Sequence, residues 1–343
     1  MHLKGAYTHE EILSQPEAWE AALQVLAGLR QEILALYTGN QPEQIIFTGC
    51  GSTYYLSLAA AALTQELTGR TARGLPGSEL WLYPSASYPR TGRALLVAVS
   101  RSGATTETLR ACQAFKDSGR GALLTISCYG DEPLAALGDL NIVLPSGAER
   151  SVAQTRAFST LYLATVALAA IWGKQGQVYD QLAALPLACR RLLERYAGQA
   201  RSLAQDPSYG RFYFLGSGPR YGLACELSLK MKEMSLSHSE PFHFMEFRHG
   251  PKSMVNPDTL VIGLVSEQNF SSENKVLEEM QAMGAGIFSM GEMASTVVFE
   301  AGLLEAARNI LFLPIGQLLA FERAIAKGLD PDLPENLQAV IRL

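Results

Sequence analysis

Short runs of continuous apolar residues alternate with longer helical stretches along the chain, and the same order of runs occurs twice. In each half, an apolar run ends in a Gly-x-Gly turn that opens a helical stretch, and two further apolar runs follow. The matching pairs of runs are 45–49 and 212–216, 94–100 and 260–266, and 122–126 and 287–290. Strands that are buried on both faces lose the polar alternation of half-exposed strands, so these runs predict parallel strands covered by helices.

The repeat predicts an α/β protein made of two tandem lobes, each with a doubly wound parallel sheet. A chain of 343 residues is long enough for two such lobes. We expect an N-terminal helical segment at 1–39, a first lobe at 40–175, a helical linker at 176–199, a second lobe at 200–325 and a C-terminal tail at 326–343. In the N-terminal segment, Thr8 is expected to cap a helix that Pro16 interrupts.

The composition indicates a compact protein that binds neither nucleic acid nor a membrane. Hydrophobic residues make up 48% of the chain and charged residues 18%. The 28 basic and 33 acidic residues give a net charge of -5 without a basic block, whereas binding to a phosphate backbone needs clustered cations. The N-terminus lacks the pattern of a secretory signal. The most apolar stretch, 157–173, contains Ser159, Thr160 and Thr165 and is interpreted as a buried helix.

The cysteines favour a reducing compartment, which we take to be the cytoplasm. They are five in number and include no CxxC pair and no histidine partners at zinc-ligand spacing. They are Cys50, Cys112, Cys128, Cys189 and Cys225. We expect buried, unpaired thiols.

The two glycine turns place helix N-termini where a bound anion would be stabilised. A dinucleotide-binding fingerprint would need a third glycine in each turn, at positions that hold Tyr54 and Tyr221. Dinucleotide binding is therefore not expected.

The turn after the second apolar run of the first half, 100–108 (SRSGATTET), concentrates hydroxyl groups at the start of a helical stretch. Serine and threonine are also common caps and turn residues, which is the structural alternative. The matching position in the second half, 266–270 (SEQNF), lacks the hydroxyl cluster and its glycine, so the fold does not require them. We therefore predict that the first-half turn binds a phosphate monoester.

Three charged residues, Glu226, Lys230 and Glu233, share one face of the helix expected at 221–235. The alternative is a solvated stripe stabilised by an i,i+4 pair worth only about 0.2–0.5 kcal/mol. The matching helix of the first half, 55–63, carries no charge, so these positions are ones that the fold would bury. A carboxylate partly buried beside an ammonium is suited to acid–base catalysis.

A histidine-rich segment, 238–251, holds three of the five histidines and is expected to form a loop. A metal site would combine these histidines with nearby carboxylates, but the spacing matches no standard ligand pattern, so no metal is expected. The residues weighed for it are His238, His243 and His249 with Glu240 or Glu246. A histidine that moves protons near neutral pH and a hydrogen-bonded structural histidine both remain open.

Five motifs together resemble the sugar isomerase (SIS) family, over nearly the whole chain. The likeness is to the isomerase half of glucosamine-6-phosphate synthase and to the cofactor-free amino-sugar deaminase/isomerases. The motifs are GCGS at 49–52, SRSGATTET at 100–108, VAQTRAF at 152–158, ELSLKMKE at 226–233 and FRHGP at 247–251.

The resemblance implies that a phosphosugar binds at the carboxyl ends of the first lobe's strands. It implies sugar contacts from Cys50, Gly51, Ser52, Thr53 and the backbone of Val152, and phosphate contacts from Ser100, Arg101, Ser102 and Thr105. It also implies that Glu233 moves a proton between C1 and C2, that Lys230 assists, and that His249 opens the sugar ring. In relatives this histidine comes from the neighbouring subunit, which implies a homodimer with a shared active site. No cofactor is implied.

Two departures from the synthase pattern bear on the expected reaction. The sequence begins at the isomerase unit, so we do not expect ammonia from glutamine hydrolysis. The lysine that follows the asparagine and leucine of the synthase tail is absent, because Asn336 and Leu337 are followed by QAV.

The expected function is that of a cytoplasmic, cofactor-free aldose–ketose isomerase/deaminase acting on an amino-sugar 6-phosphate of the glucosamine or galactosamine type. One alternative is a fructosamine-6-phosphate deglycase, which uses related enolamine chemistry. Another is a phosphosugar-binding sensor without catalysis.

Overall fold

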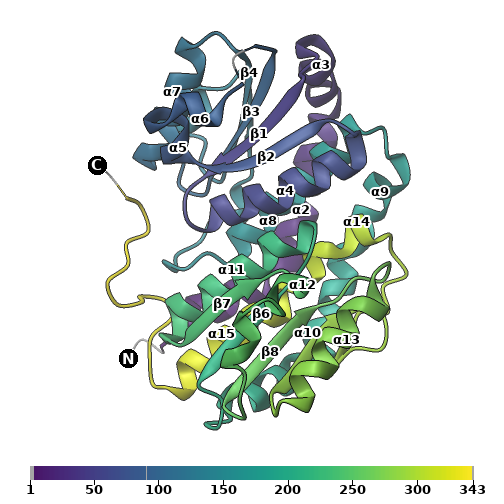
Figure 1. Ribbon diagram of the computed structural model, residues 1–343. Coiled ribbons are helices and arrows are strands. Elements are labelled where there is room, and N and C mark those ends of the chain that lie inside the picture. Colours follow the sequence, from purple (N-terminus) through teal and green to yellow (C-terminus); the bar gives the residue numbers. More distant parts are fainter. Residues whose placement is uncertain (1–3, 90, 342–343) are drawn as a thin grey trace. The chain divides into compact units, whose positions relative to one another are not determined.

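The computed structural model describes residues 4–89 and 91–341, which form two parallel five-stranded sheets with surrounding helices (Figure 1). The chain divides into two compact units. The first-lobe unit comprises 17–149, 156–183 and 338–341, and the second-lobe unit comprises 4–16, 150–155 and 184–337. Each unit contains one sheet.

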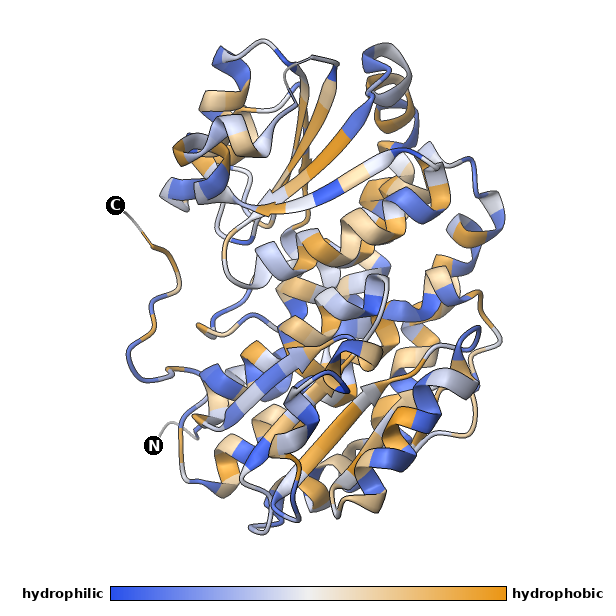
Figure 2. Cartoon of the chain, in the orientation of Figure 1, coloured by the Kyte–Doolittle hydropathy of each residue, from blue (hydrophilic) through white to orange (hydrophobic). Residues whose placement is uncertain are grey.

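The sheet of the first-lobe unit has the strand order β2-β1-β3-β4-β5, with all neighbours parallel. Its strands are β1 (Gln44–Gly49), β2 (Thr71–Pro76), β3 (Ala94–Ser100), β4 (Gly121–Ser127) and β5 (Leu140–Val143). Every residue of β1 and β3 is buried, because helices cover the sheet on both faces. The central strands are coloured hydrophobic over most of their length in Figure 2.

The sheet of the second-lobe unit has the order β7-β6-β8-β9-β10 and repeats the topology of the first. Its strands are β6 (Arg211–Leu215), β7 (His238–Phe242), β8 (Thr259–Leu264), β9 (Gly286–Gly291) and β10 (Val297–Val298). In both sheets, the five strands, counted along the chain, stand in the order second, first, third, fourth and fifth, and all neighbouring strands are parallel. The expected fold of two α/β lobes related by an internal repeat is therefore confirmed.

The helices of the chain follow the same alternation. In the first half they are α1 (Ala6–Leu13), α2 (Gln15–Gly28), α3 (Arg30–Asn40), α4 (Ser52–Thr68), α5 (Gly77–Leu82), α6 (Pro84–Ser87), α7 (Thr106–Asp117), η1 (Pro133–Ala136), η2 (Pro145–Gly147), α8 (Arg156–Trp172), α9 (Gly176–Gln181) and η3 (Leu182–Ala184). In the second half they are α10 (Leu185–Gln205), α11 (Pro219–Ser235), α12 (Phe244–Phe247), η4 (Pro251–Met254), α13 (Phe270–Ala282), α14 (Glu305–Arg308), η5 (Asn309–Leu311) and α15 (Phe312–Ala326).

The glycine turns that follow β1 and β6 have nearly the same backbone geometry. Gly51 precedes α4 with φ 58° and ψ -123°, and Gly218 precedes α11 with φ 57° and ψ -135°. This region of conformational space is essentially restricted to glycine. The repeat therefore extends from the order of the strands to the turns that start the helices.

The predicted edges of the sheets differ from the observed ones. The four outer strands, β2, β5, β7 and β10, were not expected. The first three are only partly buried and contain polar residues, and β10 has only two residues. The expectation of a loop over the histidine-rich segment is wrong for its first part, because 238–242 pair with β6 as strand β7. An edge strand contacts only one neighbour and does not need a continuous apolar run.

The N-terminal cap is also different from the prediction. Thr8 lies inside α1 rather than before it, and the carboxylate of Asp332 accepts hydrogen bonds from the backbone N–H groups of Tyr7 (3.1 Å) and Thr8 (2.7 Å). The carboxylate of Asp332, in the tail, thus accepts hydrogen bonds from backbone amides in the first turn of α1. The sequence had predicted that Thr8 would cap this helix instead. Pro16 lies in the first turn of α2, after α1 has ended at Leu13.

The boundaries of the five predicted segments stay a prediction. The structure shows which elements their residues form and to which unit they belong. The residues of the expected linker, 176–199, are largely helical, and the division between the two units falls after residue 183. Of the expected N-terminal segment, α1 belongs to the second-lobe unit, whereas α3 belongs to the first-lobe unit.

The most apolar helices are buried. In α8, every residue from Ala157 to Trp172 is buried, as expected for this stretch. Among the described residues, one helical stretch, Glu305–Ala326, is long and apolar enough to cross a membrane, and 83% of its most apolar window is buried inside the protein. Burial of this extent is typical of core helices, so the stretch is weak support for a membrane span.

None of the five cysteines, all of which lie in the described part of the chain, forms a disulfide bond, and four of them are buried. Cys50 is the exception, with intermediate exposure, and it follows directly after β1.

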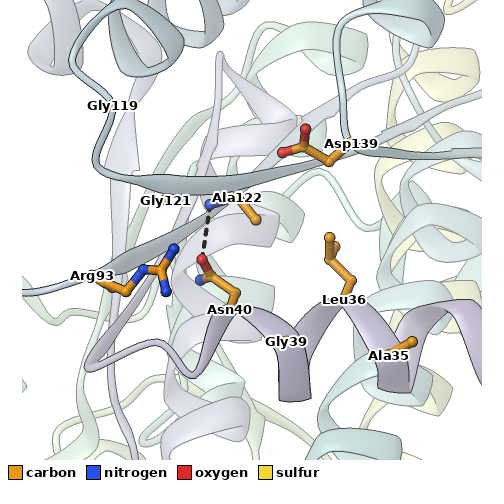
Figure 3. Close-up of a pocket in the computed structure, with 9 residues that line it drawn as sticks. All are labelled: Ala35, Leu36, Gly39, Asn40, Arg93, Gly119, Gly121, Ala122 and Asp139. Atoms are coloured by element: carbon orange, nitrogen blue, oxygen red, sulfur yellow. Dashed lines mark hydrogen bonds between the residues drawn. The ribbon is translucent and has the colours of Figure 1, made fainter.

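Asn40, the last residue of α3, joins two strands of the first-lobe sheet (Figure 3). Its side-chain N–H donates to the backbone carbonyl oxygen of Ala94 (3.0 Å), and its side-chain amide oxygen accepts from the backbone N–H of Ala122 (3.1 Å). We expect Asn40→Ala to lower the free energy of unfolding by about 1–3 kcal/mol, because two backbone groups lose their partner. Urea denaturation measures this loss.

Thr38→Ala is the matched control for Asn40→Ala. The Thr38 hydroxyl donates only to exposed carbonyl groups of its own helix, so its loss should cost much less. Equal effects of the two substitutions would contradict the bridging role of Asn40.

Candidate active site

The first glycine turn places a cysteine and two hydroxyl residues at the carboxyl end of β1. The Thr53 hydroxyl accepts from the N–H of Cys50 (2.9 Å) and donates to the carbonyl oxygen of Cys50 (3.0 Å), which fixes the turn. The Cys50 sulfur lies 3.4 Å from the hydroxyl of Thr108. Burial raises the pKa of the Cys50 thiol, so it is protonated at neutral pH. Cys50 is therefore not an activated nucleophile.

The loop after β3 gathers three hydroxyl groups, and we call Ser100, Ser102 and Thr105 the hydroxyl loop. The Ser100 oxygen lies 3.5 Å from each of the other two, which are 3.4 Å apart. Thr105 is the N-cap residue of α7, so the positive end of this helix faces the same place. Gly103 has φ 68°, which lets the loop fold back so that its N–H donates to the Ser100 oxygen (3.2 Å).

The two loops are neighbours because β1 and β3 pair in parallel. Thr48 lies opposite Ala98, so the residues that follow these strands leave the same edge of the sheet side by side. Ligands bind at the carboxyl ends of the strands in open α/β sheets. The hydroxyl loop can offer donors to an anion, and the glycine turn can line the rest of the ligand.

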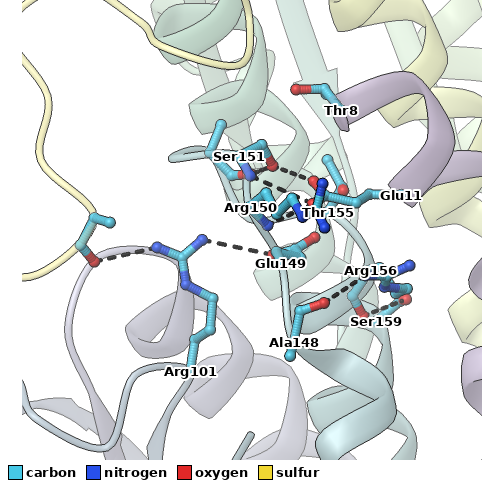
Figure 4. Close-up of polar contacts among 12 residues, drawn as sticks. Thr8, Glu11, Arg101, Ala148, Glu149, Arg150, Ser151, Thr155, Arg156 and Ser159 are labelled. Atoms are coloured by element: carbon cyan, nitrogen blue, oxygen red, sulfur yellow. Dashed lines mark hydrogen bonds and ion pairs between the residues drawn. The ribbon is translucent and has the colours of Figure 1, made fainter. Parts of the chain in front are cut away.

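Arg101 is buried and its charge is paired (Figure 4). One guanidinium nitrogen lies 3.5 Å from a carboxylate oxygen of Glu149, and another donates to the carbonyl oxygen of Ala339 (3.1 Å). The N–H of Thr106, in the first turn of α7, donates to the carbonyl oxygen of Ile341 (3.3 Å). The tail thus docks on the loop that the sequence identified as a phosphate site.

Val152 belongs to the second-lobe unit, where its N–H donates to the carbonyl oxygen of Asp332 (3.1 Å). The residues just before it are fixed by Glu11, whose carboxylate accepts from the N–H groups of Arg150 (2.6 Å) and Ser151 (3.3 Å). These contacts hold the segment 150–155 against the N-terminal helix and the tail of its own unit.

The charged face of α11 is buried, which excludes a solvated stripe. The Lys230 ammonium lies 3.3 Å from a carboxylate oxygen of Glu226 and also contacts Glu233. The side chains of Lys230 and Glu226 are 0% exposed, whereas that of Glu233 is 20% exposed. Burial opposes the charged form of Lys230, but the two carboxylates outweigh it and raise its pKa. Lys230 is therefore an ammonium ion at neutral pH.

Glu233 is the member of this cluster that reaches a cavity. The cavity has a volume of about 170 Å³ and lies between the end of α11, the N-terminus and the tail. Its lining residues are Lys4, Glu233, Met234, Leu236, Gly328, Leu329, Asp330, Leu333, Pro334 and Glu335. A carboxylate held by a buried ammonium at the wall of a cavity is placed to exchange protons with a ligand there.

The histidines are dispersed. His238 lies 3.7 Å from a carboxylate oxygen of Glu240, and His243 stacks on Tyr221 with ring centroids 3.8 Å apart. Burial lowers the pKa of His243, which keeps it neutral. His249 is exposed between α12 and η4, and within 4–89 and 91–341 its side chain makes no hydrogen bond or ion pair with Lys230 or Glu233. In the same ranges, no group of three or more His, Cys, Asp or Glu residues is arranged to hold a metal ion.

The residues predicted from the sequence therefore fall into both units. The first-lobe unit contains Cys50, Gly51, Ser52, Thr53, Ser100, Arg101, Ser102 and Thr105, and the second-lobe unit contains Val152, Lys230, Glu233 and His249. The structure brings the hydroxyl loop together in one unit and the Lys230–Glu233 pair in the other. The sequence did not reveal Glu149, Asp332 or Lys4, because each acts through contacts distant along the chain.

A second cavity of about 460 Å³ lies at the opposite end of the first-lobe sheet, beside Arg93, Asn40 and Asp139 (Figure 3). It adjoins the amino-terminal ends of β3 and β4 and contains none of the predicted site residues. Although this cavity is larger than the one beside Glu233, its position does not fit the expected chemistry.

The sequence matches the SIS domain family over residues 40–171 and 208–298. It is 27% identical, over 97% of its length, to the isomerizing glutamine–fructose-6-phosphate aminotransferase of Shewanella oneidensis, and it spans 59% of the length of that relative. The glucosamine-6-phosphate deaminase structure from Thermotoga maritima has a TM-score of 0.83 and 24% identity, with 98% of this chain and 100% of that chain covered. The tagatose-6-phosphate ketose/aldose isomerase structure from Escherichia coli has a TM-score of 0.86 and 22% identity, with 97% of each covered. These structures share the fold.

Proposed function

The chain belongs to the SIS domain family, and we propose that it is a cofactor-free aldose–ketose isomerase/deaminase that acts on an amino-sugar 6-phosphate of the glucosamine or galactosamine type. The observation that carries this proposal is the buried Lys230 ammonium between Glu226 and Glu233, with Glu233 facing a cavity. A buried charge cluster costs several kcal/mol of desolvation. The positions of α4 that match Glu226 and Lys230 in the repeat hold Ala59 and Leu63, so the fold does not require this buried pair, which favours catalysis over a purely structural role.

The phosphate group is proposed to bind at the hydroxyl loop. The three oxygens lie within 3.5 Å of one another and can turn their protons toward an anion. The N-terminus of α7 adds its dipole. Arg101 is proposed to shape the loop through Glu149, because its guanidinium is already engaged there. Cys50, Gly51, Ser52 and Thr53 are proposed to line the sugar, with the backbone of Val152.

The proton transfer is proposed to use Glu233 as the base. Once the ring is open, Glu233 removes the C2 proton of the aldehyde form, which gives an enolamine, and returns a proton to C1. Water then hydrolyses the resulting C2 imine to a ketose phosphate and ammonia. The Lys230 ammonium stabilises negative charge that develops near the carboxylate. His249 is proposed to open the ring from a neighbouring subunit, since it is exposed and unattached to this cluster.

A homodimer in the cytoplasm completes the proposal. Size-exclusion chromatography with light scattering tests the dimer. Mixing a Glu233→Gln subunit with a His249→Ala subunit tests the shared site, because a mixed dimer would regain one intact site.

The assay that tests the function compares three substrates. Purified protein is incubated with glucosamine 6-phosphate, galactosamine 6-phosphate and a fructosamine 6-phosphate, and ammonia, free amino acid and ketose phosphate are measured. Ammonia with ketose phosphate supports the deaminase. Release of an amino acid would instead identify the deglycase, and binding without turnover would identify a sensor.

Removing two hydroxyls from the loop should weaken phosphate recognition. We expect Ser102→Ala combined with Thr105→Ala to lower the affinity for a sugar 6-phosphate by about 10²–10⁴-fold, since each of the two hydrogen bonds to a charged group contributes about 1.5–3 kcal/mol. The affinity for the unphosphorylated sugar should change little. Isothermal titration calorimetry with both ligands measures the difference.

Ser118→Ala at the other end of α7 is the matched control. The Ser118 hydroxyl donates to the carbonyl oxygen of Phe115, far along the helix from the loop. Equal weakening of both ligands by the double substitution would contradict phosphate binding at this loop.

A further inference from the structure

The loop after β8 is the second lobe's counterpart of the hydroxyl loop. In both lobes a serine hydroxyl at the end of the central strand accepts a hydrogen bond from the N–H three residues later. The pairs are Gly103 to Ser100 (3.2 Å) and Asn269 to Ser266 (3.1 Å). Both loops lead into a helix, α7 in the first lobe and α13 in the second. The repeat therefore builds the same backbone turn twice.

The loop of the second lobe holds a carboxylate from the same chain. One carboxylate oxygen of Glu305, the first residue of α14, accepts from the N–H of Glu267 (3.1 Å), the N–H of Gln268 (3.3 Å) and the hydroxyl of Ser266 (3.3 Å). Backbone N–H groups that converge on one oxygen in this way are typical of anion sites. Glu305 thus fills the loop that corresponds, in the repeat, to the proposed phosphate loop of the first lobe.

A buried arginine completes this arrangement. Arg220, in the first turn of α11, is 4% exposed, and its guanidinium pairs with Glu305 and lies 3.4 Å from a carboxylate oxygen of Glu273. Glu273 in turn accepts from the N–H of Ser266 (2.6 Å). Burial alone would raise the pKa of Glu305, but Arg220 and the donors of the loop outweigh it and keep the pKa low. The carboxylate is therefore ionised at neutral pH.

We infer that the second-lobe loop is an anion-binding site whose resident anion is the carboxylate of Glu305, held by Arg220 and the amides of Glu267 and Gln268. This site is distinct from the proposed catalytic site and does not depend on the sugar used. Because the carboxylate of Glu305 fills this loop, a second phosphate group is not expected to bind there. When the carboxylate is removed, the loop takes a small oxyanion, either a carboxylate such as formate or inorganic phosphate.

The experiment compares thermal unfolding of wild type, Glu305→Ala and Glu300→Ala with and without formate or inorganic phosphate, at ionic strength matched with sodium chloride. Glu300 pairs with Arg195 through side chains that are more than half exposed, so it controls for the loss of a carboxylate nearby. We expect Glu305→Ala to have a lower Tm and to gain roughly 2–4 °C more than the other two proteins when either anion is added. An equal response of all three proteins would overturn the inference.

A second substitution tests the arginine. Adding Arg220→Met to Glu305→Ala should abolish the extra response, because the anion loses its main counter-charge. If Glu305→Ala does not fold in chloride, refolding in phosphate should recover folded protein. Failure of phosphate to do so would also overturn the inference.

Discussion

Glu233→Gln is expected to lower kcat by about 10²–10⁴-fold, the range that a positioned general base contributes. Glutamine keeps the shape of the side chain and its contact with Lys230 but cannot take a proton. The affinity for the sugar phosphate should stay close to that of wild type, because the phosphate is proposed to bind elsewhere. Steady-state kinetics combined with calorimetric titration separates the two effects.

Glu278→Gln is the matched control for this substitution. Glu278 is exposed on α13, where its carboxylate accepts from the side chain of Asn274 (2.8 Å). Its kcat should match that of wild type. Retention of turnover in Glu233→Gln would show that another group moves the proton.

Lys230→Met is expected to lower the free energy of unfolding by about 3–5 kcal/mol, because it leaves a fully buried carboxylate without its counter-charge. Glu226 is 0% exposed and has the Lys230 ammonium 3.3 Å from its carboxylate. Turnover should be lost as well, since Glu233 loses its neighbour. Urea denaturation followed by circular dichroism measures the stability.

Lys232→Met is the control for Lys230→Met on the same helix. Lys232 is exposed, and its ammonium donates to the hydroxyl of Ser228 (3.1 Å). We expect a cost well below that of Lys230→Met. The double variant Glu226→Gln with Lys230→Met should recover part of the stability, because it removes both charges. Equal costs for the two lysines would refute the buried-charge account.

The centre of the fold could be predicted because its signals are local. The strands β1, β3, β6 and β8 are largely continuous apolar runs. Because the order of runs is duplicated, the two lobes are expected to share one strand order. The shared face of Glu226, Lys230 and Glu233 also follows from helical spacing. Burial of that face was inferred from the uncharged segment 55–63 of the first lobe. The structure confirms burial for Glu226 and Lys230, whereas Glu233 is 20% exposed and matches Glu66 of α4.

The remaining features depend on contacts between distant residues and leave no local pattern. Asp332 caps a helix more than 300 positions earlier, and Glu305 fills a loop nearly 40 positions before it. The edge strands escaped prediction because a half-exposed strand needs few apolar residues, and β7 even contains His238 and Glu240. The spacing of residues along the sequence does not predict which carboxylate accepts from which amide when the two groups lie on different elements.

The most direct measurement follows glucosamine 6-phosphate and galactosamine 6-phosphate by proton NMR in D₂O with wild type and with Glu233→Gln. We predict that wild type converts at least one of them to a ketose 6-phosphate with loss of the C2 proton, and that Glu233→Gln binds the same compound without converting it. Loss of the C2 proton at an unchanged rate in Glu233→Gln, or no conversion of either compound by wild type, would contradict this prediction.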